Sequence, residues 1–96
     1  MHAVIRTYAG PSAKKLFDLL DERKGEVESV IRPIKGLVSY TIFRTAEGGA
    51  SVTVCQDKAG VDESVRVARD WIQKNASNIS ASPPAVSEGT VIVQLK

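Results

Sequence analysis

The sequence predicts one α+β domain in which the elements follow one another as strand, helix, strand, strand, helix, strand. Three observations lead to this prediction. The 96 residues are 43% hydrophobic and 25% charged, as in an ordinary globular domain with a single core. Two long segments repeat apolar residues every three or four positions, as amphipathic helices do. Around them lie short segments rich in β-branched and aromatic residues, bounded by glycine or proline.

The spacing of apolar residues changes near residue 10, where the first predicted strand ends and the first predicted helix begins. Ala3–Tyr8 is β-rich, and a glycine–proline pair ends it, after which Ser12 is the expected N-cap of a helix. Pro33 must stop that helix, Gly25 predicts a kink in it, and Lys24 occupies the one apolar position that is missing. The apolar stripe consists of Ala13, Leu16, Phe17, Leu20, Val27, Ile31 and Ile34.

Leu37–Thr45 and Ala50–Gln56 form the predicted central hairpin. Both runs are rich in β-branched residues, and the two glycines of the Ala46–Gly49 turn supply the positive φ that tight hairpins need. Because side chains alternate along a strand, Val52 and Val54 share one face. We expect that face to meet the helices.

The second helix and the last strand complete the chain. Asp62–Ala76 is the expected helix, and its apolar stripe consists of Val61, Val65, Ala68, Ile72 and Ala76. A connection rich in serine and proline follows at 77–89. Thr90–Leu95 is the expected last strand, with its apolar side toward the helices: Val91, Val93 and Leu95.

This order of elements is the split βαβ plan of ferredoxin-like domains. It predicts a four-stranded antiparallel sheet with both helices on one face, and one domain spanning residues 1–96. The opposite face is expected to be nearly free of charge, which is unusual for a sheet that faces water. The residues expected there are Ser39, Thr41, Phe43, Thr53, Cys55 and Ile92. A second copy would bury this face, so we predict a homodimer that pairs through its sheets.

Composition argues against several classes of function. One cysteine cannot form an internal disulfide, and no Cys/His cluster exists to hold a metal, so we expect neither a metal nor a cofactor. The net charge of +2 comes from interleaved residues, 13 basic and 11 acidic, which predicts no nucleic-acid partner. The apolar runs are far shorter than the roughly 20 residues of a membrane span. No signal peptide is evident, and a cytoplasmic location is expected.

Two short stretches resemble segments of a known superfamily. The run Ile34–Arg44 looks like the helix-to-strand segment of the dimeric α+β barrel superfamily, in its antibiotic-biosynthesis-monooxygenase branch. Pro83–Val91 resembles the approach to the last strand in the same branch. The resemblance implies two sheets paired into a barrel across a dimer. Its members include oxygenases, isomerases, haem-degrading enzymes and proteins of no known activity.

The resemblance is weaker toward the haem-degrading members. Those use an asparagine on the first strand, a tryptophan on a helix and a histidine further along. Trp71 matches the tryptophan, but the first strand offers Arg6 and Thr7, and the only histidine, His2, lies in the wrong element. A cofactor-independent oxygenase would need only a shaped pocket with aromatic and polar groups, which this sequence can supply.

Five side chains are candidates for a pocket, although none receives a catalytic role: Trp71, Tyr40, Arg6, Tyr8 and Asn75. Trp71 either caps the core or forms one wall of a pocket between helices and sheet. Arg6 is either part of an ion pair at the sheet edge or an anchor for an anionic substrate. The expected function is binding of a small aromatic or apolar molecule, with a monooxygenase-like reaction if the protein is an enzyme. The alternative is a non-catalytic module for ligand sensing or assembly.

Overall fold

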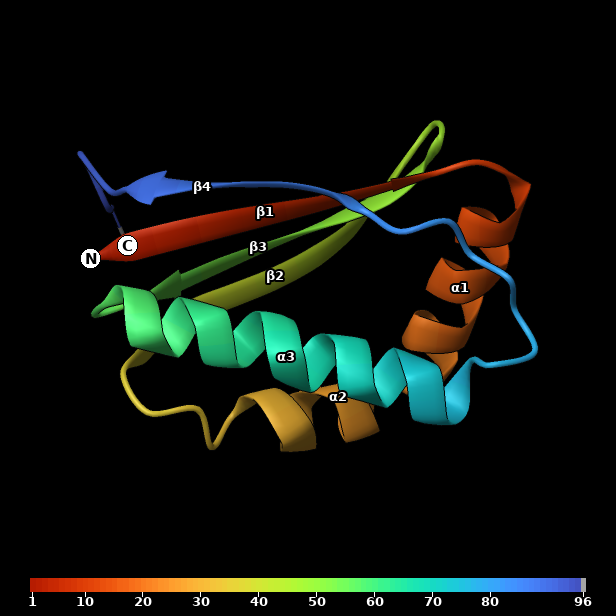
Figure 1. Ribbon diagram of the computed structural model, residues 1–96, viewed down its shortest axis with the longest axis horizontal. Helices are drawn as coiled ribbons and strands as arrows, with labels where there is room; N and C mark the ends of the chain where they lie inside the picture. Colours follow the sequence, from red (N-terminus) through yellow and green to blue (C-terminus); the bar gives the residue numbers. More distant parts are fainter. Residues whose placement is uncertain (96) are drawn as a thin grey trace.

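The computed structural model describes residues 1–95 and contains four strands and three helices (Figure 1). The predicted order of elements is confirmed, with the first predicted helix divided in two. The elements are β1 (His2–Ala9), α1 (Pro11–Glu22), α2 (Lys24–Ile31), β2 (Leu37–Thr45), β3 (Gly48–Cys55), α3 (Lys58–Asn75) and β4 (Ala85–Thr90).

The four strands form one antiparallel sheet in the order β2-β3-β1-β4, so β1 and β3 are its central strands. The helices cover one face of this sheet: α2 and α3 lie side by side, and α1 packs near the β2–β3 turn (Figure 1). The predicted ferredoxin-like α+β fold is therefore confirmed. Within residues 1–95, no helix combines the length and the hydropathy that a membrane crossing requires.

Both helix starts differ from the predicted ones. Gly10, with φ of 106°, occupies the N-cap of α1 and Pro11 begins the helix, so Ser12 already lies inside its first turn. Glycine tolerates this positive φ and proline fits the first helical position, which together replace a side-chain cap. The α3 helix begins four residues earlier than predicted, because the Asp57 carboxylate accepts a hydrogen bond of 3.0 Å from the Gly60 backbone N–H.

The break in the first helix falls at Arg23 rather than at Gly25. Arg23 leaves the helical region (φ −112°, ψ 30°) but still closes the last turn of α1 by donating its backbone N–H to the Leu19 carbonyl. The next residue starts α2. The predicted apolar stripe survives the break, since Leu16, Phe17 and Ile31 are all buried.

The two faces of β3 are the reverse of those predicted. In an antiparallel pair, residues directly opposite each other share a face. Ser51 lies opposite Arg6, and Thr53 lies opposite both Val4 and Tyr40. Ser51, Thr53 and Cys55 therefore face the helices, while Val52 and Val54 lie on the outer face. Small side chains are required on the inner face because the large ones come from β1, β2 and the helices.

The predicted last strand is also wrong in position. β4 ends at Thr90, which pairs with His2, and only the Val91 N–H continues the pairing, at 3.0 Å from the Met1 carbonyl. His2–Thr90 is the last residue pair of this register in the part of the chain that the structure describes. The apolar residues that were assigned to this strand lie beyond it and are exposed: Ile92 (95%), Val93 (71%) and Leu95 (85%).

Gly49 provides the first test. A Cβ at this position of β3 would overlap the ring of Phe17, which packs directly on the bare backbone. We expect Gly49→Ala to lower the free energy of unfolding by about 1–3 kcal/mol, because the ring must leave its rotamer. Urea denaturation measures the change. Gly25→Ala is the control, since nothing lies within 4 Å of that position, and equal stability of the two variants would contradict the packing described.

Candidate functional site

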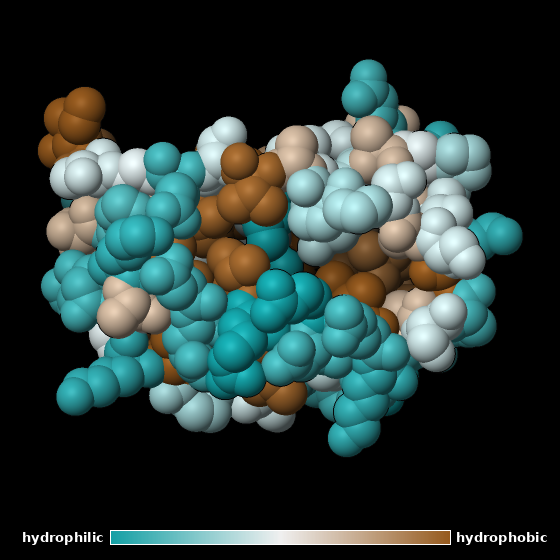
Figure 2. All heavy atoms as spheres, in the orientation of Figure 1, coloured by the Kyte–Doolittle hydropathy of each residue, from teal (hydrophilic) through white to brown (hydrophobic). Residues whose placement is uncertain are grey.

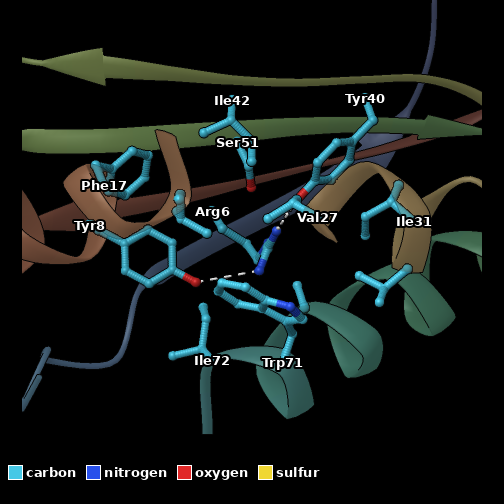
Figure 3. Close-up of a pocket in the computed structure, with 13 residues that line it drawn as sticks. Arg6, Tyr8, Phe17, Val27, Ile31, Tyr40, Ile42, Ser51, Trp71 and Ile72 are labelled. Carbon is cyan, nitrogen blue, oxygen red and sulfur yellow. Dashed lines mark hydrogen bonds between the residues drawn. The ribbon is translucent and has the colours of Figure 1, made fainter. Parts of the chain in front are cut away.

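A small cavity of about 20 Å³ lies between the helices and the inner face of the sheet (Figure 3). It has the volume of roughly one water molecule, so the walls are in near contact. The lining is apolar except for three residue types, arginine, tyrosine and serine. It consists of Arg6, Tyr8, Phe17, Leu20, Val27, Val30, Ile31, Tyr40, Ile42, Ser51, Ala68, Trp71 and Ile72.

Arg6 lies at the centre of this site and is only 4% exposed. Its Nη1 donates to the Tyr8 hydroxyl at 3.3 Å, and its Nη2 donates to the Tyr40 hydroxyl at 3.1 Å. Figure 3 shows the two hydroxyls reaching the guanidinium from different sides. The Nε is buried without a partner, and no carboxylate of residues 1–95 pairs with Arg6. Arg6 lies on a central strand, and the ion pair at the sheet edge does not exist in the described chain.

Both tyrosines act as neutral hydrogen-bonding groups. Burial raises the pKa of Tyr8, and the nearby Arg6 charge only partly offsets that effect. Burial likewise raises the pKa of Tyr40 against the same opposing charge. At neutral pH both phenols therefore keep their protons and can donate them to a third group. Tyr8 is held in place by an edge-to-face contact with Phe17, with 5.7 Å between ring centroids.

Trp71 fits both of the roles considered for it. It is 8% exposed, belongs to the main core cluster and forms a wall of the cavity. Its other side meets the Arg23 guanidinium, 5.3 Å from the ring centroid. Asn75 accepts from Arg23 Nη2 at 3.1 Å and donates to the Trp71 carbonyl at 2.9 Å. Of the five predicted site residues, Asn75 alone is not part of the cavity lining; it instead links Arg23 to the turn that carries Trp71.

Ser51 belongs to the site and was missed by the sequence analysis. It is buried, its hydroxyl has no hydrogen-bond partner, and it points toward the space beside Arg6 (Figure 3). The sequence analysis assigned the faces of β3 from its valines, which placed Ser51 on the face away from the helices. The register was the missing signal, since Ser51 lies directly opposite both Arg6 and Ile42.

Two larger clefts flank the cavity and share its walls. One, of about 370 Å³, lies between α1, α2 and β2, and shares Phe17 and Tyr40 with the cavity. The other, of about 440 Å³, lies between α3 and segment 81–86, and shares Arg6 and Tyr8. Arg6 and Tyr8 therefore connect the cavity to the cleft beside α3, and Tyr40 connects it to the cleft beside α1 and α2.

The remaining reactive residues take no part in this site. Cys55 is fully buried, and burial raises the pKa of its thiol, which opposes a nucleophilic role. His2 lies 3.7 Å from the Glu88 carboxylate near the end of β1. No group of three or more histidine, cysteine or acidic residues that could hold a metal occurs in the described part of the chain.

The cavity has room for the hydrogen-bond acceptor of a ligand, and the flanking clefts have room for its body. Aromatic and aliphatic walls exclude water from the centre, so hydrogen bonds made there are stronger than in solution. Arg6, Tyr8, Tyr40 and Ser51 all offer donors to the same small volume. An oxygen atom that carries or develops negative charge is the group these donors favour.

No protein-family model matches the chain, and no curated protein matches it. Several solved structures do match the chain. The chain is similar to the NE2512 protein of unknown function from Nitrosomonas europaea, with a TM-score of 0.71, 15% identity, and 99% of this chain and 92% of that chain covered. It is also similar to a monooxygenase from the gene ActVA-Orf6 of Streptomyces coelicolor, solved with nanaomycin D. There the TM-score is 0.62, the identity 19%, and the coverage 99% and 89%.

A third similar structure is a dimeric ferredoxin-like protein from an uncultured marine organism. Its TM-score is 0.66 and its identity 13%, and the match covers 99% of this chain and 95% of that one. These likenesses run over nearly the whole chain and confirm the ferredoxin-like α+β fold that the sequence predicted. At such low identities they establish the fold and leave the activity to the residues of the site.

Arg6 provides the test of this site. A buried guanidinium without a carboxylate is unfavourable, so Arg6→Met is expected to raise the free energy of unfolding by about 1 kcal/mol or more. Thermal and urea denaturation measure the change. Arg44→Met is the matched control on the surface, where the lost contacts to Asp18 and Asp21 leave stability nearly unchanged. A strong loss of stability in Arg6→Met would mean that the guanidinium is structural.

Proposed function

We propose that this chain binds a small, mostly apolar aromatic molecule between its helices and sheet, and acts on it as a monooxygenase that needs no bound cofactor. The observation that supports this proposal is the buried donor cluster around Arg6, enclosed by Trp71 and aliphatic side chains. A functional site is the usual reason for keeping an uncompensated charge in a core.

The monooxygenase part follows from what the cluster does to a phenolic ligand. Donors placed around the ligand oxygen stabilise its anion, and an electron-rich anion is the form that gives electrons to O₂ without a cofactor. The similar structure from Streptomyces coelicolor is a monooxygenase solved with nanaomycin D, which supports the same class of reaction. In this chain Arg6, Tyr8 and Tyr40 would hold the oxygen, and Trp71 would lie along the ring.

A non-catalytic ligand sensor is the second candidate. The cavity lining contains no histidine and no carboxylate, so a general base to deprotonate the ligand is missing from its walls. Oxygen consumption separates the two candidates. Incubation with a panel of electron-rich phenols and anthrones should consume O₂ without added cofactor, and Arg6→Met should abolish it. Ligand binding without turnover across the panel would favour the sensor.

We further propose that the chain forms a homodimer through the outer face of its sheet. With the faces of β3 corrected, this face carries Val52 and Val54 in place of Thr53 and Cys55, and is more apolar than predicted. Ile5 and Phe43 are 44% and 46% exposed on it. Sheet-to-sheet packing would remove these side chains from water, and a dimeric ferredoxin-like protein is among the similar structures.

Trp71 is the only tryptophan, so its fluorescence reports directly on the site. Titration with aromatic ligands is expected to shift or quench its emission, because the indole forms a cavity wall. Trp71→Phe should weaken binding by about 10-fold, while it lowers stability by only about 1–2 kcal/mol. Unchanged emission across a broad aromatic library, together with a large loss of stability in the variant, would assign Trp71 to the core alone.

The molar mass of the protein in solution tests the proposed dimer. Light scattering at micromolar concentration should give twice the 10.3 kDa of one chain. Phe43→Lys places a charge on the proposed interface and should give a folded monomer, since a buried unpaired charge opposes association. Ser29→Lys adds the same charge on the helix side and should leave the mass unchanged. A wild-type mass near 10 kDa would reject the dimer.

A further inference from the structure

The two clefts that flank the cavity differ in charge. The cleft beside α1 and α2 is balanced: Arg44 pairs with Asp18 at 2.8 Å and with Asp21 at 3.2 Å. Lys24 pairs with Asp21 at 3.6 Å. A ligand entering on this side would meet cations that already have carboxylate partners.

The cleft beside α3 is not balanced. Its lining contains Arg6 at the floor and Arg69 at the rim, and it contains no aspartate or glutamate. Arg69 is exposed and makes no ion pair with any residue that the structure describes, whereas Arg66, one turn away, pairs with Glu63 and Asp70. Two cations therefore face one cleft without a compensating charge. Figure 2 shows this side of the molecule, with a hollow above the charged surface of α3.

The floor of this cleft also has more donors than acceptors. A guanidinium has five N–H groups, and Arg6 uses one on Nη1 and one on Nη2, both toward tyrosine hydroxyls. Its Nε is buried without a partner in the part of the chain that the structure describes. Buried donors are nearly always satisfied in folded proteins, so the free N–H groups of Arg6 favour a ligand that supplies acceptors. A carboxylate supplies two oxygens and the charge that Arg6 lacks.

The rest of the cleft lining is suited to an apolar body. It is formed by Val65 and Ile72 of α3, by the two prolines of the connection, Pro83 and Pro84, and by Val86 of β4. Prolines hold the connection in a fixed, extended form, so this wall is preorganised. The volume of about 440 Å³ is in the range of sites for small organic ligands.

We propose that the cleft between α3 and segment 81–86 binds an aromatic monocarboxylate, with its carboxylate on Arg6 and its ring against the apolar wall. This inference rests on the proposed function, because Arg6 and Tyr8 line both the cavity and this cleft. Arg69 at the rim attracts the anion and orients it as it enters. The phenol proton of Tyr8, which lines the same cleft, completes the set of donors around the carboxylate.

The experiment compares 2-naphthoate with the neutral 2-naphthamide, which has nearly the same shape, by calorimetry on the wild-type protein. The acid should bind at least about 10-fold more tightly than the amide, because only the acid pairs with the guanidinium. Arg6→Met should remove this preference, and Arg69→Gln, an exposed change with no folding risk, should weaken naphthoate several-fold. Arg44→Gln, in the balanced cleft, is the matched control and should bind as the wild type does.

Three results would overturn the inference. Equal binding of acid and amide would reject the anion site while leaving the proposed small-molecule function intact. Competition by inorganic phosphate at concentrations equal to those of naphthoate would assign the cleft to phosphate groups. Failure of both naphthalene probes to bind would reject this ligand class, and the Trp71 titration with neutral aromatics then decides separately whether the proposed function survives.

Discussion

A single buried charge governs the interior of this protein. Arg6 lies on a central strand, 4% exposed, and the described chain offers it two tyrosine hydroxyls but no carboxylate. Transfer of an unpaired charge from water into a core is costly, so the surrounding residues must offset that cost by placing polar atoms around it. Tyr8 and Tyr40 do so from neighbouring positions of the inner face, and Ser51 adds a third hydroxyl. The cavity is the space left where these groups meet.

The small side chains on the inner face of β3 leave space for that arrangement. Its inner face carries Gly49, Ser51, Thr53 and Cys55, all small, between strands whose inner residues are large. Phe17 packs on the bare backbone of Gly49, and Tyr8 packs edge-to-face on Phe17. Large residues on both neighbours with small ones between them is the complementarity that a dense core requires. The same alternation sends the valines of β3 to the outer face of the sheet, away from the helices.

Local patterns predicted the fold well because they report on local physics. Periodicity located the buried stripe of α1 and α2, and composition located β2 to the residue. Hydrophobicity could not predict the inner face of β3. Ser51 is buried because a small side chain is needed opposite Arg6, and not because it is apolar. β4 was misplaced because the segment that pairs with β1 is exposed and polar, and its register with β1 is a long-range contact that local hydrophobicity does not report. Four of the five predicted site residues do meet in the cavity, because alternation along β1 and β2 correctly oriented Arg6, Tyr8 and Tyr40.

The break at Arg23 has a mechanical consequence. Because α1 and α2 are separate helices joined at one residue, the axis of α2 is set independently of that of α1. Three residues of α2, Val27, Val30 and Ile31, form part of the cavity wall, so the direction of this short helix determines how nearly the cavity is filled. An unbroken helix would tie that wall to Leu16 and Phe17, which α1 holds in the core. The interruption thus gives the cavity a wall eight residues long whose position does not follow from the packing of α1.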